Sequence, residues 1–278
     1  MTSKNLLVEL LVEELPPKAL RMLGEAFADG LANSLKAQGL AAGDASVTSF
    51  ATPRRLAVLV SSVAVQAADK AVSQKLMPVS VGLDAAGNAT PALLKRLHAL
   101  GAAPAAVAGL KRAVDGKGEA LFYESLVTGA TLAAGLQKAL GDAIDKLPIP
   151  KVMSYQLAAD CELPGWSSVN FVRPAHGLVA LHGADIVPVQ ALGLRSGNTT
   201  HGHRFEAALS PLVIADADAY AATLARDGAV IASFAERRAL IVQQLAAAAA
   251  KVGSGARAIE DDALLDEVTS LEIGRAHV

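Results

Sequence analysis

The chain has 278 residues, of which 52% are hydrophobic and 19% charged, and its formal net charge is −2. This composition is that of a globular protein and excludes a disordered or fibrous chain, while the length allows one large domain or two small ones. A small domain that works on nucleic acid is usually strongly basic, so any contact with RNA must come from local patches or from a larger assembly.

The single cysteine, Cys161, excludes a disulfide framework and a four-cysteine zinc site within the chain. One cysteine also fits a reducing compartment. Residues 1–18 carry Glu9, Glu13 and Glu14 among their apolar residues, which excludes a signal peptide there. Since no apolar run reaches the roughly 18 residues needed to span a bilayer, we expect a cytoplasmic protein without a membrane partner.

The first 65 residues predict a β-α-β opening. The pair Pro16-Pro17 ends the first apolar run and favours a helix start, because proline is tolerated at the first helical position. Gly39 is suited to end that helix, and Pro53 breaks the extended segment that follows. The expected elements are a strand over residues 6–11, a helix over 18–38 and extended chain over 47–65.

Residues 66–118 have a less regular pattern, with turns at residues 84–88 and 115–118. We expect strands over 120–127 and 152–155 and helices over 91–100, 131–144, 218–226, 234–251 and 259–271. Residues 161–168 (CELPGWSS) mark the clearest change in composition. The sequence therefore predicts an α+β fold, with mixed sheets and flanking helices, in two regions: residues 1–163 and residues 164–278.

Residues 171–205 are the most informative stretch of the chain. They hold three arginines, no lysine and four of the six histidines, carried by two apolar runs that predict strands. Guanidinium forks and imidazoles at strand ends suit a surface that binds anions. The stretch therefore predicts binding of a polyanion rather than catalysis.

Two basic pairs lie at predicted strand starts. Arg54 and Arg55 are adjacent, and neighbouring strand side chains point to opposite faces, so one can face a ligand while the other faces solvent or a carboxylate. The alternative is a salt-bridged strand start. Arg173 and His176 stand three residues apart; the alternative there is an arginine packed along the sheet with a hydrogen-bonded histidine behind it.

The loop over residues 197–204 is polar, and its two glycines let backbone N–H groups approach an anion. A metal site is the alternative, because His201 and His203 form an H-x-H pair that needs two further ligands. The candidates for these are His176, His182 and Asp185.

A second basic doublet, Arg237-Arg238, begins a predicted helix and is either a further anion contact or, as we expect, a solvated face. Acidic residues 260–262 lie at the start of the last predicted helix, where their negative charges stabilise it through the helix dipole. No phosphate-binding loop, dinucleotide fingerprint or nucleophile elbow is present in the sequence. We therefore expect no catalytic residue, no metal and no cofactor bound by this chain.

Several segments together resemble the β subunit of bacterial glycyl-tRNA synthetases. They stand in the same order as in that family: LLVELLVEELPPKAL, FATPRRLAVLV, KLPIPKVM, FVRPAHGLVAL, DIVPVQALGLRSGNTTHGHRF, FAERRALI and DALLDEVTSL. The resemblance runs from Leu6 to Leu271 and is specific because the motifs occur jointly. Two departures stand out: Gly177, where the family commonly has a bulky aromatic, and Leu76-Met77, where it commonly has Arg-Gly.

The resemblance implies an α/β heterotetramer that joins glycine to its tRNA with ATP and Mg²⁺, the α subunit housing the activation site. It implies that this chain is the N-terminal part of a longer β subunit, inactive alone, with the α subunit and tRNA(Gly) as partners. Part of the fold is then similar to the B3/B4 region of phenylalanyl-tRNA synthetase. Residues 272–278 (EIGRAHV) match a translated sequencing-adapter read, so we expect a non-native tail after a reading frame cut near Leu271.

Seven residues are expected to share one polar face, as RNA contacts or as its supports: Arg54, Arg55, Arg173, His176, Arg195, His203 and Arg204. One rival is an assembly module, in which the same face holds another protein domain and RNA touches none of it. A second rival is a metal-dependent hydrolase built on the clustered histidines.

Overall fold

The computed structural model describes residues 3–84, 86–115, 118–157, 167–253 and 255–273. The chain forms two compact units: unit 1 comprises Met1–Ala67 and Ala130–Val278, and unit 2 comprises Ala68–Gly129. The predicted boundary between residues 163 and 164 lies outside the described residues, as do Cys161 and the last five residues of the predicted tail. The observed units divide the chain at other positions.

Unit 1 is built on a five-stranded antiparallel sheet in the order β10-β9-β1-β3-β2. The strands are β1 (Ser3–Val12), β2 (Val47–Thr52), β3 (Arg55–Ala64), β9 (Ala175–His182) and β10 (Asp185–Ile186). In the central strand, Leu10 lies opposite Leu56 of β3 and Leu178 of β9. The predicted β-α-β opening is confirmed, and segments far apart in sequence meet on β1.

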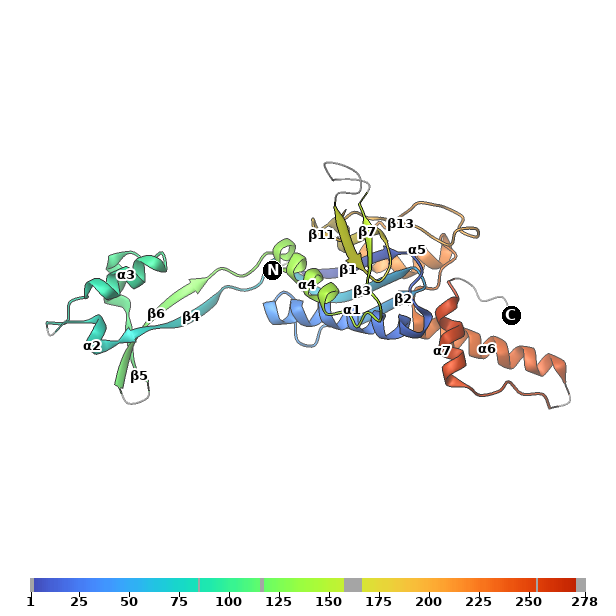
Figure 1. Ribbon diagram of the computed structural model, residues 1–278, viewed down its shortest axis with the longest axis horizontal. Coiled ribbons are helices and arrows are strands. Elements are labelled where there is room, and N and C mark those ends of the chain that lie inside the picture. The colour runs from blue at the N-terminus through green and yellow to red at the C-terminus, as the bar shows by residue number, and fades with distance from the viewer. Residues whose placement is uncertain (1–2, 85, 116–117, 158–166, 254, 274–278) are drawn as a thin grey trace. The chain divides into compact units, whose positions relative to one another are not determined.

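Helices α1 (Pro17–Gln38) and α4 (Leu132–Asp145) cover one face of this sheet (Figure 1). Successive strand side chains alternate between faces, so Leu6, Val8 and Leu10 point into the core that these helices complete. Pro17 lies in the first turn of α1, and Gly39 ends the helix in the left-handed conformation with φ of 77°, as predicted.

The opposite face packs against the short helices η2 (Ala217–Ala219) and α5 (Tyr220–Arg226) (Figure 1). Leu7 of β1 and Leu181 of β9 join Tyr220 and Leu224 in this second core. Glu9 follows Leu7 by two residues and therefore points to the same face, where it is buried.

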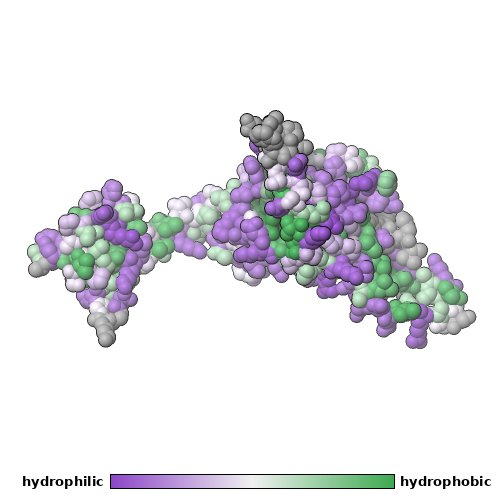
Figure 2. Space-filling view, viewed as in Figure 1, coloured by the Kyte–Doolittle hydropathy of each residue, from purple (hydrophilic) through white to green (hydrophobic). Residues whose placement is uncertain are grey.

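The last two helices are α6 (Phe234–Val252) and α7 (Asp262–Leu271). The Asp261 carboxylate accepts a hydrogen bond from the Leu264 N–H at 3.0 Å and so caps α7. The helix thus begins among the acidic residues that the sequence places at its start. Apolar side chains gather along both helices (Figure 2) and line a groove of about 960 Å³. Its exposed apolar residues include Val242, Leu245, Ile259 and Leu264.

The second apolar run of the 171–205 stretch is not one strand. It forms only short pieces, because Pro188 has no N–H to donate to a ladder and its neighbours Val187 and Val189 turn into the core. The small two-stranded sheets of unit 1 pair β7 (Met153–Gln156) with β8 (Ser168–Phe171), β11 (Gln190–Ala191) with β12 (Leu194–Arg195), and β13 (Thr199–Thr200) with β14 (Leu212–Val213).

Unit 2 is an antiparallel sheet, β4-β6-β5, with short helices on it. Leu93, Leu97 and Leu121 form its small core, and Leu76 and Met77 pack against them. The departure from the family pattern at Leu76-Met77 thus adds apolar packing here. The elements are β4 (Lys70–Pro78), α2 (Val79–Gly82), α3 (Pro91–Ala99), η1 (Pro104–Gly109), β5 (Lys111–Asp115) and β6 (Gly118–Val127).

The α+β class is confirmed, but the described sheets are antiparallel and not mixed as predicted. Every strand pair within the described residues is antiparallel, apart from an isolated parallel bridge between Val179 and Gly197. No helix in the described part of the chain is long and apolar enough to cross a membrane.

Candidate functional site

Five of the seven predicted residues line one cavity of about 440 Å³ in unit 1: Arg54, Arg55, His176, His203 and Arg204. We call this cavity the basic pocket. Its walls meet because β3 and β9 both run antiparallel to β1, so each begins beside the end of β1. The tight turn before β3 therefore brings Arg54 and Arg55 next to the Glu13-Glu14 pair that follows β1.

Arg55 forms the buried wall of the basic pocket, with only 2% of its surface exposed. Its Nη2 donates a hydrogen bond to the His201 carbonyl at 2.6 Å, and its Nε lies 3.9 Å from the Glu9 carboxylate. Within the described residues, its Nε and Nη1 have no hydrogen-bond partner. Arg55 therefore holds the 201–204 loop in place and keeps a buried positive charge beneath it.

Glu9 is the counter-charge of Arg55 and is 1% exposed. Its two carboxylate oxygens accept hydrogen bonds from the hydroxyls of Thr200 and Tyr220. Burial raises the pKa of Tyr220 well above its usual value, and the neighbouring Glu9 charge raises it further. The network joins β1, β3, β13 and α5 beneath the pocket.

Glu13 holds two of the predicted residues on one carboxylate. Its Oε1 accepts from Arg54 Nη2 at 3.0 Å and lies 3.0 Å from His176 Nε2. All three side chains are partly exposed at the pocket wall. The carboxylate thereby orients a guanidinium and an imidazole without removing them from solvent.

The loop after β13 carries the remaining pocket residues in a fixed conformation. The backbone N–H groups of Phe205 and Glu206 donate to His203 Nδ1 at 3.3 and 3.1 Å, so the proton of a neutral His203 is on Nε2. A Cβ on Gly202 would lie 2.6 Å from the Gly228 backbone, so only glycine allows the two segments to approach this closely. Arg204 makes no ion pair with any residue that the structure describes.

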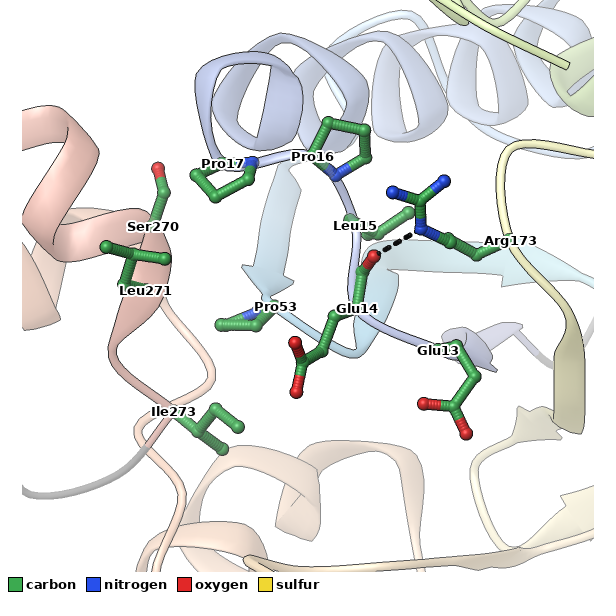
Figure 3. A pocket seen from close by; sticks show the side chains of 10 residues that line it. All are labelled: Glu13, Glu14, Leu15, Pro16, Pro17, Pro53, Arg173, Ser270, Leu271 and Ile273. Atoms are coloured by element: carbon green, nitrogen blue, oxygen red, sulfur yellow. Dashed lines mark hydrogen bonds between the residues drawn. The ribbon is translucent and has the colours of Figure 1, made fainter.

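Arg173 and Arg195 lie outside the basic pocket. Arg173 lines a neighbouring cavity of about 500 Å³, where its Nε donates to the Glu14 carbonyl at 2.8 Å (Figure 3). In that view the Glu13 and Glu14 carboxylates turn away from the Arg173 guanidinium. Arg195 lines a third cavity, together with Gln137 and Ile186. The structure thus brings five of the seven residues together and separates the other two.

The metal-site alternative finds no ligand set in the described part of the chain, where no three His, Cys, Asp or Glu side chains are grouped to hold an ion. His182 is buried, and its Nε2 lies 2.7 Å from the Val63 carbonyl. Asp185 pairs with Lys4 at 2.7 Å. Neither reaches the His201–His203 pair.

The solvated face predicted for the second basic doublet is wrong for Arg237, which is 1% exposed. It donates to the carbonyls of Ala51 at 2.7 Å and Ile231 at 2.8 Å, so it joins α6 to β2. Burial lowers its pKa to about 10, with the nearby Arg55 charge contributing. Arg238 instead pairs with Asp262 and Asp266 on α7 at 2.5 and 2.6 Å.

Sequence reasoning missed two residues of the basic pocket region. Glu9 carried a signal, since a carboxylate within an apolar strand run needs a buried partner. Phe205 carried a weaker one, as an aromatic directly after a loop of histidine and arginine. It lines the pocket with 87% of its surface exposed.

Comparison with known proteins finds matches that extend over nearly the whole chain. The family model described as "Glycyl-tRNA synthetase beta subunit" matches residues 6–273. A protein named glycine–tRNA ligase beta subunit from Polaromonas naphthalenivorans (strain CJ2) is 72% identical over 275 residues, which cover 98% of this chain and 39% of the relative. Proteins of the same name from Paracidovorax citrulli (strain AAC00-1) and Dechloromonas aromatica (strain RCB) are 68% and 66% identical, again over 98% of this chain. The chain thus spans 38–39% of the length of these relatives.

Proposed function

The chain belongs to the glycyl-tRNA synthetase β-subunit family, and from this membership we propose that it helps bind tRNA(Gly) and associates with the α subunit during ATP-dependent attachment of glycine to that tRNA. The resemblance carried by its motifs is confirmed by the family match over residues 6–273. The role proposed is one of binding and assembly, performed in the cytoplasm.

The basic pocket is the proposed RNA contact. Three arginines and two glutamates line it, which gives a formal net charge of +1 with neutral histidines, on a chain whose net charge is −2. Arginine forks match phosphate geometry. The observation that carries the proposal is Arg204, a guanidinium at the pocket that no described carboxylate neutralises. A local positive site on an acidic chain supports a polyanion partner.

The other predicted residues have different proposed roles. His203 offers its Nε2–H to the RNA beside Arg204. Arg54 and His176 are already paired with Glu13, so their proposed contribution to RNA binding is smaller. Arg55 positions the loop from below. Arg173 and Arg195, in separate cavities, would extend the contact along the surface.

Chemistry is proposed to take place elsewhere. ATP and Mg²⁺ would be bound by the α subunit, and this chain would bind no cofactor and make no glycyl-tRNA alone. Part of its architecture would correspond to the B3/B4 region of phenylalanyl-tRNA synthetase. Aminoacylation by the isolated chain would contradict this division of labour.

An assembly module without direct RNA contact is the second candidate. It is favoured by the groove of exposed apolar side chains between α6 and α7, a surface type that marks protein–protein contacts. It is also favoured by Arg173, whose guanidinium is bonded to main-chain oxygens of Glu14 and Val172.

Filter binding of tRNA(Gly) to this chain, across a series of salt concentrations, separates the two candidates. RNA binding through phosphate contacts predicts that the logarithm of the association constant falls linearly with the logarithm of the salt concentration. Both candidates predict retention of the α subunit in a pull-down, but an assembly module predicts no tRNA binding by the chain.

A further inference from the structure

Phe205 is the aromatic side chain that the basic pocket presents to solvent. The Phe205 side chain is 87% exposed, whereas that of His203, two residues earlier, is only partly exposed. Single exposed apolar residues are common on protein surfaces, so exposure alone indicates nothing. The case for Phe205 rests on how it is held and on what lies beside it.

The segment that carries Phe205 is fixed on both sides. The backbone N–H of Phe205 donates to His203 Nδ1, and the two rings meet edge to face with centroids 6.2 Å apart. His203 N–H donates to the Gly228 carbonyl at 2.7 Å, and Ala208 N–H donates to the Asp227 carbonyl at 2.9 Å. Because the backbone is held in this way, the Phe205 ring stays at one place on the surface, and stacking a base on it costs less conformational entropy than on a free segment.

Charge lies next to this ring. Arg204 precedes Phe205, lines the same pocket and pairs with no described carboxylate, and the Nε2 of His203 has no hydrogen-bond partner among the described residues. Beneath them lies the buried Arg55 guanidinium, whose Nε and Nη1 have no hydrogen-bond partner in the described chain, although Nε lies 3.9 Å from the Glu9 carboxylate. An aromatic ring face beside basic hydrogen-bond donors is complementary to one nucleotide, which has a flat base and an anionic phosphate.

We infer that Phe205 and Arg204 form a platform for an unpaired nucleotide of RNA, with the base stacked on the Phe205 ring and its phosphate bound by Arg204 and His203. The inference rests on the proposed function and adds the class of RNA structure that is recognised. Bases inside an A-form duplex are stacked on each other, whereas those of single-stranded ends and loops are open to aromatic side chains. The cavity of about 440 Å³ lies within the range of small-molecule sites.

Three substitutions at Phe205 separate stacking from simple apolar contact. Phe205→Trp keeps an aromatic face, Phe205→Leu keeps apolar surface without one, and Phe205→Ala keeps neither. Leu209→Ala is the control, since Leu209 is a 59% exposed apolar residue four positions along the same segment. The probes are a single-stranded oligoribonucleotide, the duplex of the same sequence and tRNA(Gly), each titrated against the 278-residue chain.

Stacking predicts that Phe205→Leu and Phe205→Ala both lose about fivefold to a hundredfold in affinity for the single strand. Phe205→Trp should bind the single strand as tightly as the parent does. The new tryptophan adds its fluorescence to that of Trp166, and binding of the single strand should quench the added part. The duplex should bind more weakly and equally to all variants, and Leu209→Ala should match the parent.

Single-strand affinity unchanged in Phe205→Leu would overturn the platform, and so would a preference for duplex. If the Phe205 variants lost only α-subunit binding, the residue would belong to an assembly surface and the platform would again be wrong. The proposed function fails in a different way, namely if the parent chain binds none of the three RNAs.

Discussion

The Glu9 carboxylate and the Arg55 guanidinium lie 3.9 Å apart inside unit 1, and each residue is at most 2% exposed. Breaking such a pair leaves a buried charge without its partner, which costs about 3–5 kcal/mol. We therefore expect Glu9→Gln and Arg55→Met each to lower the free energy of unfolding by that amount in urea denaturation. The double variant should cost less than the sum of the two, because neither charge remains. Additive costs would show that the two side chains are not coupled.

Arg237 and Arg238 are adjacent on α6 but have opposite environments. Arg237 is buried and donates to main-chain carbonyls, whereas Arg238 pairs at the surface with Asp262 and Asp266. Arg237→Ala should cost about 3 kcal/mol or more, since buried carbonyls lose their donors. Arg238→Ala should cost about 1 kcal/mol or less. Equal losses in the two denaturation curves would contradict this difference.

Tyr220 makes stability depend on pH in alkaline solution. Its folded-state pKa is raised above 10.0, first by burial and then by Glu9, so the unfolded chain releases this proton at lower pH than the folded chain does. The stability it contributes is therefore complete below about pH 10 and is lost as the pH rises toward the folded pKa. Above pH 10 the free energy of unfolding should fall less steeply with pH in Tyr220→Phe than in the parent. The difference between the two slopes should be about 1.4 kcal/mol per pH unit. Identical slopes for parent and variant would rule out this origin.

Gly177 in β9 can accept a side chain. A Cβ there would lie 3.5 Å from Leu11 Cβ, an ordinary contact. Glycine within a strand costs about 0.5–1 kcal/mol relative to alanine, so Gly177→Ala should raise the thermal midpoint. Gly202→Ala is the opposing control: its Cβ would meet the Gly228 backbone at 2.6 Å and should lower the midpoint. A lower thermal midpoint for Gly177→Ala would show that β9 and β1 lie too close together at Gly177 and Leu11 to accept the added methyl group.

The sequence predicted most of unit 1 because local signals and packing agree there. Pro17 and Gly39 bound α1, and the apolar run of β1 is buried on both faces, so pattern and structure coincide. The run after β9 was mispredicted because Pro188 interrupts its ladder. The salt-bridged strand start considered for Arg54 and Arg55 is present in their pairs with Glu13 and Glu9. The main-chain partners of Arg55 and Arg237, His201 and Ala51, were beyond sequence reasoning because both are distant in sequence.

The candidate site was predictable in composition but not in geometry. Arginines and histidines near strand ends indicated an anion-binding face. The antiparallel pairing of β1 with β3 and β9 gathers Arg54, Arg55 and His176, and the loop after β13 adds His203 and Arg204. Periodicity gives no information on which cations are neutralised. Only the structure shows that Glu13 holds Arg54 and His176, while Arg204 pairs with no described carboxylate.

The most direct test of the account is the salt dependence of tRNA(Gly) binding by Arg204→Ala, compared with Lys138→Ala. Lys138 is an exposed, ion-paired cation on α4, across the sheet from the basic pocket. If Arg204 contacts a phosphate, its loss should weaken binding and reduce the slope of log affinity against log salt by about one, while Lys138→Ala leaves both unchanged. An unchanged slope in Arg204→Ala would contradict the assignment of this pocket to RNA.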